Sequence, residues 1–208
     1  MAWGFTVTCV AGLAALLFAE TSQPAWRRPA KMVASTAFVA VALSLGAWDT
    51  GFGRWMVAGL ALSWLGDLLL TYPSRTAFLG GLVAFLVAHV AYIVAFLVRG
   101  VAGPLWFATL VVLVVGGFIV RWLWPYVDQQ MRLPVVAYVV TISLMVLAAA
   151  ATAQADAEWR IPVGAVAFYL SDIAVARDRF VAPGVVNRIW GLPLYYGAQL
   201  LFDWTAGA

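Results

Sequence analysis

Residues 76–98 read TAFLGGLVAFLVAHVAYIVAFLV, and this stretch indicates the fold class of the chain. Its 23 residues include no Asp, Glu, Lys or Arg, and their one ionisable imidazole is His89. A helix needs about 20 mostly apolar residues to cross the hydrocarbon core of a bilayer. The stretch therefore predicts a transmembrane helix with a histidine in its middle.

The rest of the 208-residue chain repeats this pattern. It is 65% hydrophobic and 10% charged, whereas soluble domains are about half apolar and a quarter charged. Only short connections separate the apolar segments, so we expect one domain over residues 1–208. The predicted fold is all-α, a polytopic transmembrane bundle of eight helices. The predicted spans are 3–19, 30–47, 53–72, 76–98, 104–124, 132–153, 159–177 and 186–204.

The basic residues predict the orientation of the bundle. Nine lie at one membrane face and three at the other, and an excess of Lys and Arg marks the cytoplasmic face. Both termini are then expected outside the cytoplasm of a bacterial-type inner (plasma) membrane. The nine are Arg27, Arg28, Lys31, Arg75, Arg121, Arg132, Arg177, Arg179 and Arg188; the three are Arg54, Arg99 and Arg160.

Several function classes are disfavoured by composition. The net charge of +3 is small and scattered, so no nucleic-acid partner is expected. Cys9 is the single cysteine and His89 the single histidine, which leaves few strong zinc ligands. We expect no metal and no cofactor. The apolar run from Trp3 to Phe18 lacks a basic leader and a small-residue cleavage site, so it is interpreted as the first helix.

Asp67 and Asp172 stand out among the ionisable residues inside the predicted spans. Each is five residues before the end of its helix, at Tyr72 and at Arg177. The third and seventh helices run in the same direction, so both carboxyls are about 8 Å inside the cytoplasmic end. They can meet if the two helices pack together. Desolvation and like-charge repulsion would then keep one of them protonated, which suits a general acid.

The remaining polar residues in the spans have both a structural and a functional interpretation. Ser63, one turn before Asp67, can simply bond the backbone, and buried tyrosines are often core residues. His89 and Tyr92 follow Asp67 by 22 and 25 residues, while Tyr195, Tyr196 and Gln199 follow Asp172 by 23, 24 and 27. The similar spacings suggest a possible parallel four-helix repeat.

Four segments carry a resemblance to a known family. They are Ser63-Trp64-Leu65-Gly66-Asp67, the run from Phe78 to Tyr92, the run from Gly164 to Asp172, and the run from Leu194 to Leu200. In order and spacing they resemble the lysoplasmalogenase family of eight-helix membrane hydrolases, also called YhhN-like. The second helix departs from that family's Lys-Pro opening, because Pro29-Ala30-Lys31 stands there.

The resemblance implies hydrolysis of the vinyl ether bond of lysoplasmalogen to a fatty aldehyde and a glycerophospho-base. Asp67 and Asp172 would be catalytic, one as the acid and the other as the carboxylate that stabilises the oxocarbenium ion, as in glycosidases. The substrate is a lysophospholipid that reaches the site from the membrane. Residues expected to bind it are Lys31, Ser63, Arg75, His89, Tyr92, Tyr138, Ser171, Arg179, Tyr195, Tyr196 and Gln199.

Two other functions remain open at the level of sequence. A proton-coupled transporter of small molecules or lipids could use the same aspartates, although transporter sites usually lie nearer the midplane. A metal-dependent intramembrane hydrolase would need more ligands than one histidine provides. The sequence leaves open the headgroup of the substrate, the choice of acid and the oligomeric state.

Overall fold

The computed structural model describes residues 1–207, and these residues form eight α-helices, as predicted. Short 3₁₀ turns join several of them, and a π-helical turn over Arg177–Val181 leads from α7 toward α8. The helices are α1 Ala2–Thr21, α2 Arg27–Ser44, α3 Gly51–Leu70, α4 Arg75–Arg99, α5 Trp106–Leu123, α6 Gln129–Asp156, α7 Arg160–Ala176 and α8 Val185–Ala206.

Local sequence explains where the two central helices α3 and α4 begin and end. The side chain of Thr50 accepts a hydrogen bond from the Gly53 amide at 2.9 Å, and Ser74 accepts one from Ala77 at 3.0 Å. Hydroxyl side chains at such positions satisfy amides that the first helical turn leaves free. Gly100 follows α4 with φ +118°, a conformation that side chains with a Cβ rarely adopt, and the helix ends there.

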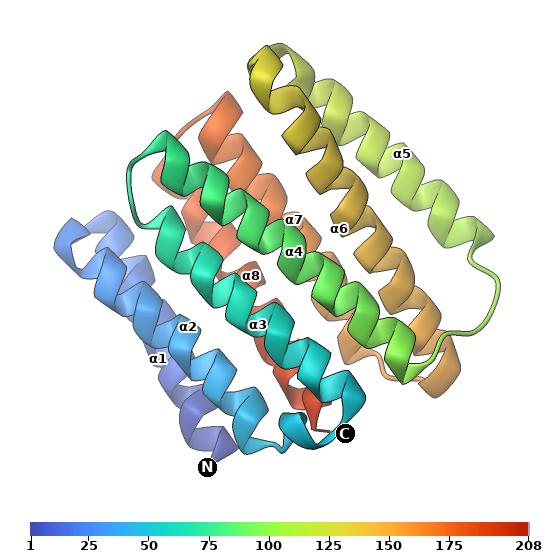
Figure 1. Cartoon of the computed structure of the whole chain (residues 1–208). Helices are drawn as coiled ribbons and strands as arrows, with labels where there is room; N and C mark the ends of the chain where they lie inside the picture. The colour runs from blue at the N-terminus through green and yellow to red at the C-terminus, as the bar shows by residue number, and fades with distance from the viewer. Residues whose placement is uncertain (208) are drawn as a thin grey trace.

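The helices form two layers (Figure 1). In one layer α2, α3, α4 and α6 lie in sequence side by side, and α5 packs on the outer side of α6. Behind them α1, α8 and α7 form the second layer, so α8 contacts α1, α2, α3 and α7. Both termini lie at the same end of the bundle, as an even number of crossings requires.

Small residues allow the closest helix pairs to approach. A Cβ added to Gly66 on α3 would lie 2.6 Å from the ring of Phe85 on α4. A Cβ on Gly191 of α8 would lie 2.6 Å from the Cβ of Ala174 on α7. Lipid is as apolar as the helix surfaces, so the hydrophobic effect does not drive helices together within a membrane. Small residues at the interfaces let the helices approach closely and associate through van der Waals contact.

Four of the helices are long and apolar enough to cross a membrane by length and composition: α1, α4, α6, and α5 extended to Tyr126. The other four, α2, α3, α7 and α8, carry charged and amide side chains that lie between helices, among them Lys31, Asp67, Asp172 and Gln199. The polar groups are buried between helices, while large apolar side chains such as Phe118 face outward. The parallel four-helix repeat stays a prediction.

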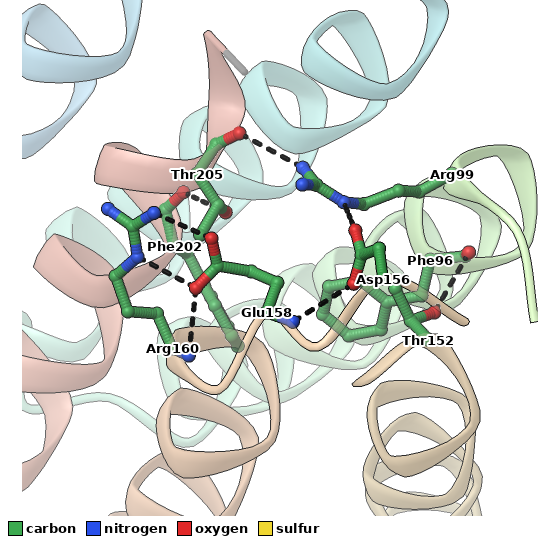
Figure 2. A network of polar contacts seen from close by, with 8 residues as sticks. All are labelled: Phe96, Arg99, Thr152, Asp156, Glu158, Arg160, Phe202 and Thr205. Atoms are coloured by element: carbon green, nitrogen blue, oxygen red, sulfur yellow. Dashed lines mark hydrogen bonds and ion pairs between the residues drawn. The ribbon is translucent and has the colours of Figure 1, made fainter. Parts of the chain in front are cut away.

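A network of arginines and carboxylates holds the end of α8 (Figure 2). Arg99 donates to the Thr205 carbonyl at 3.3 Å and pairs with Asp156. Arg160 donates to the Trp204 carbonyl at 3.2 Å and pairs with Glu158 at 2.6 Å. The hydrogen bond from Arg160 lowers the pKa of Glu158 below its ordinary value. Positive charge at a helix C-terminus satisfies carbonyls that lack helical partners.

Candidate functional site

Asp67 on α3 is buried and is surrounded by donors. Lys31 Nζ on α2 lies 2.9 Å from Oδ1. Oδ2 accepts hydrogen bonds from Ser35 Oγ at 2.6 Å and from the Tyr195 hydroxyl at 2.7 Å. Charge-assisted bonds of this kind are about twice as strong as bonds between neutral groups.

Tyr196, next to Tyr195 on α8, contacts two of the residues that surround Asp67. Its hydroxyl lies 3.0 Å from Ser35 Oγ and donates to the carbonyl of Lys31 at 3.3 Å. The ring is fully buried and contacts Phe38. Tyr196 therefore orients the residues that bind Asp67 and does not itself contact the carboxylate.

Asp172 on α7 has a different environment. Its Oδ2 accepts one hydrogen bond, from the Tyr138 hydroxyl on α6 at 2.8 Å. His89 Nε2 on α4 lies 3.6 Å from the same oxygen, beyond hydrogen-bond distance. His89 Nδ1 is 2.6 Å from the Phe85 carbonyl, a contact that requires the proton on Nδ1. No ammonium or guanidinium among residues 1–207 pairs with Asp172.

The two carboxyls do not form the joined pair that the sequence analysis allowed. Since α3 packs chiefly on α4, and α7 on α8, the two aspartate-bearing helices are not close neighbours. Aromatic rings separate the carboxyls instead. Tyr195 contacts Phe168 with ring centroids 5.4 Å apart, and Phe168 contacts His89 at 4.6 Å. The site thus has two carboxyl groups on opposite sides of a wall of aromatic rings.

A third set of predicted residues lies deeper in the bundle. The Tyr92 hydroxyl donates to Gln199 Oε1 at 2.8 Å and lies 3.4 Å from Ser63 Oγ. All three side chains are fully buried. Ser171 is also buried, next to Asp172 and close to Gly191 of α8. These residues adjoin the aspartate clusters but contact neither carboxylate.

Two residues predicted to bind the substrate, Arg75 and Arg179, lie at the end of the bundle where α4 begins. Arg75 donates to Gln130 at 2.7 Å, and the Arg179 guanidinium lies 4.3 Å from the centre of the Phe78 ring, one turn along α4. Lys31 differs from its predicted place at the rim. Its ammonium turns inward to Asp67, and it is a partner of the carboxylate.

Sequence reasoning missed two polar residues. Ser35 makes the shortest hydrogen bond to Asp67, yet a serine in an apolar helix gives no distinctive signal. Asp203 is fully buried on α8 and lies in the last turn of the predicted eighth span. The available signal was that Trp204, Thr205 and Ala206 follow Asp203, which indicates that the helix continues past the aspartate.

No metal site is formed by the described residues, since no three His, Cys, Asp or Glu side chains come together in residues 1–207. An open groove also lies away from the aspartates. Its volume is about 1100 Å³, and it lies between α5 and α6, with Gly117 and Leu144 in its lining. Its apolar lining suits hydrocarbon and carries no general acid, so we place the site at the aspartates.

Comparison with known proteins shows the family of the chain. The model of the YhhN family matches residues 23–206. A lysoplasmalogenase of Mycobacterium bovis is 35% identical over 89% of this chain and 69% of its own length. Lysoplasmalogenase TMEM86B of Rattus norvegicus is 33% identical over 97% of this chain and 82% of its own, and TMEM86A of Bos taurus is 29% identical over 97% and 86%.

No solved structure matches the fold. The sequence matches nevertheless cover nearly the whole chain, including both aspartates and every helix that contributes to the site. The chain belongs to the YhhN family, and its curated relatives are lysoplasmalogenases.

Proposed function

We propose that this protein hydrolyses the vinyl ether bond of a lysoplasmalogen, with Asp172 as the general acid and Asp67 as the carboxylate. The relatives named lysoplasmalogenase support the substrate class. The observation that carries the division of labour is the contrast between the two carboxyls. Asp67 has an ammonium and two hydroxyl donors, whereas Asp172 has one tyrosine donor, and the Nε2 of His89 lies 3.6 Å away, beyond hydrogen-bond distance.

The proposed chemistry follows from these two roles, an acid at Asp172 and a carboxylate at Asp67. A vinyl ether is cleaved by adding a proton to the alkene carbon farther from oxygen, which gives an oxocarbenium ion. Asp172 donates this proton, and water then adds to the carbon attached to oxygen. The hemiacetal breaks down to an aldehyde and the glycerol hydroxyl, and the proton that water loses returns to Asp172. The ionised Asp67 and the neighbouring aromatic faces favour the cationic intermediate.

The substrate is oriented by the polarity of the bundle. Arg75 and Arg179, near the first turn of α4, are suited to a phosphate at the predicted cytoplasmic surface. The hydrocarbon chain extends toward the bilayer interior, where exposed apolar side chains cover the helices. The enol ether between them then lies at the depth of Asp172, one helical turn or more below the surface.

Purified protein in detergent tests this proposal, with lysoplasmalogen as substrate and released aldehyde as the readout. In heavy water the aldehyde should gain deuterium at the carbon next to its carbonyl, because the acid protonates the alkene there. The glycerol product should gain no oxygen from labelled water, which separates this route from cleavage at the glycerol carbon. A chelator should leave the rate unchanged. No turnover in detergent together with substrate uptake by sealed vesicles would contradict hydrolysis and indicate a transporter.

A further inference from the structure

Asp203 is a third aspartate in the bundle interior, and the proposed reaction does not use it. Its side chain is fully buried, and neither carboxyl oxygen has a hydrogen-bond partner among residues 1–207. A carboxylate in such a position costs several kcal/mol unless it is neutralised or hydrated. Buried polar groups without protein partners are commonly satisfied by an internal water molecule.

Gln199 lies one turn before Asp203 on the same face of α8 and has an unused donor. Its Oε1 accepts the Tyr92 hydroxyl, while its Nε2, also buried, has no partner in the described part of the chain. Residues four apart on a helix are neighbours on its surface. One water molecule between them would accept from the amide and bond the Asp203 carboxyl, which satisfies both side chains.

From Gln199 a line of hydroxyl groups leads toward Asp67. Tyr92 bonds Gln199 at 2.8 Å and lies 3.4 Å from Ser63 Oγ, and Ser63 is one turn before Asp67 on α3. Each of these side chains is fully buried or nearly so. The line therefore crosses an otherwise apolar interior from α8 to α3.

The other end of this line is closed by the network that holds the end of α8. Arg160 binds the carbonyl of Trp204, the residue after Asp203. Arg99 binds the carbonyl of the next residue, Thr205 (Figure 2). Phe202 and Phe96 pack below this network with ring centroids 5.7 Å apart. A polar molecule beside Asp203 would thus be covered by the arginine network at the end of α8, and it would be hydrogen-bonded to Gln199 on its other side.

We propose that Gln199 and Asp203 hold a buried water molecule, and that Asp203, as a neutral acid, ends a hydrogen-bonded line that begins at Ser63, one helical turn before Asp67. The water site itself is independent of the reaction. Its use, to keep water and an exchangeable proton close to a hydrolytic centre in an apolar bundle, rests on the proposed function. Asp203 is a positioning residue in this scheme, since it acts through Gln199 and Tyr92.

Infrared difference spectroscopy tests the state of Asp203. The spectrum of the intact protein minus that of Asp203→Asn should contain the carbonyl band of a protonated carboxyl, and heavy water should shift that band. An ionised carboxylate, with its pair of carboxylate bands, would overturn the proposal in favour of a bound cation. A carbonyl band of a protonated carboxyl that does not shift in heavy water would also overturn the proposal, because it would indicate a carboxyl with no water molecule beside it.

X-ray hydroxyl-radical footprinting tests the water, because radicals formed from a bound water molecule oxidise the side chains beside it. Tyr92 and Phe202 should be oxidised although both are buried, while Met145, buried on α6, serves as the control for entry of bulk radicals. Asp203→Leu should lose most of the labelling, and Asp203→Asn should keep it. Equal labelling of the intact protein and Asp203→Leu would reject the site. Neither readout requires turnover, so failure of the proposed activity would leave both unaffected.

Discussion

At the scale of single residues, Asp67 and Asp172 are expected to respond differently to the same substitution. Asp67→Asn leaves the ammonium of Lys31 buried without its counterion, so it should lower the free energy of unfolding by about 3 kcal/mol as well as abolish turnover. Asp172→Asn removes no ion pair with a cation; it should fold normally and lose on the order of 10²–10⁴ in rate. Thermal unfolding in detergent and aldehyde release measure the two effects.

The double substitution Lys31→Met with Asp67→Asn separates stability from chemistry. It removes both charges and should restore most of the stability that Asp67→Asn loses, while turnover stays absent. Near-normal turnover of a folded Asp172→Asn protein would contradict the assignment of the acid. Near-normal turnover of the double variant would contradict the role of the carboxylate.

Two adjacent tyrosines provide a matched comparison. Tyr195 donates directly to the Asp67 carboxylate at 2.7 Å, whereas Tyr196 bonds only Ser35 and a backbone carbonyl. Loss of a hydrogen bond to a charged group costs more than loss of one between neutral groups. Tyr195→Phe should therefore lower kcat on the order of tenfold, and Tyr196→Phe should lower it less. A larger loss for Tyr196→Phe in the same aldehyde assay would contradict this arrangement.

At the scale of helices, the contact of α3 with α4 depends on Gly66. Gly66→Ala places a Cβ 2.6 Å from the Phe85 ring, which contacts Phe168 and Tyr195 in the wall between the carboxyls. Overpacking of this kind costs about 1–3 kcal/mol, so the unfolding midpoint should fall. Gly117→Ala on α5 is the control, since its Cβ would meet nothing within 4 Å. It should be neutral or slightly stabilising, and equal losses for both variants would exclude close packing as the cause.

The network at the end of α8 predicts a pH dependence of stability. The pKa of Glu158 is lower in the folded protein than its ordinary value of 4.5, chiefly through the hydrogen bond from Arg160. A lowered pKa stabilises the fold above the unfolded value, and this contribution is lost as pH falls through the folded value. Glu158→Gln should lower the unfolding midpoint at pH 7, and its difference from wild type should shrink below pH 4.5. A constant difference across that range would argue against the ion pair.

At the scale of the whole molecule, orientation is the prediction still to be tested. Both termini lie at one end of the bundle, and the charge count of nine against three places that end outside the cytoplasm. A reporter that is active only outside the cytoplasm should be active when fused after Ala208. Activity from a reporter that works only inside the cell would reverse the orientation and move Arg75 and Arg179 to the outer surface.

Much of the fold could be predicted from sequence because lipid permits few solutions. Apolar length alone indicated eight helices, and the cost of charge in a membrane singled out Asp67 and Asp172. Partners could not be predicted, since they depend on which helices pack together. The inward turn of Lys31 and the donor Ser35 follow from the contact of α2 with α3, which one sequence does not specify.

The central place of α8 has a consequence for biogenesis. The helix closest to the C-terminus contacts α1, α2, α3 and α7, and its Trp204 ring lies 4.6 Å from that of Trp3 at the opposite end of the sequence. Synthesis delivers the N-terminal helices to the membrane first. In a nascent chain of seven helices, Asp67 therefore lacks the Tyr195 hydroxyl, and the polar side chains that α8 would cover face lipid. Insertion of α8 is the step that covers these side chains. Chains truncated before residue 185 are therefore expected to be substrates for membrane quality-control proteases.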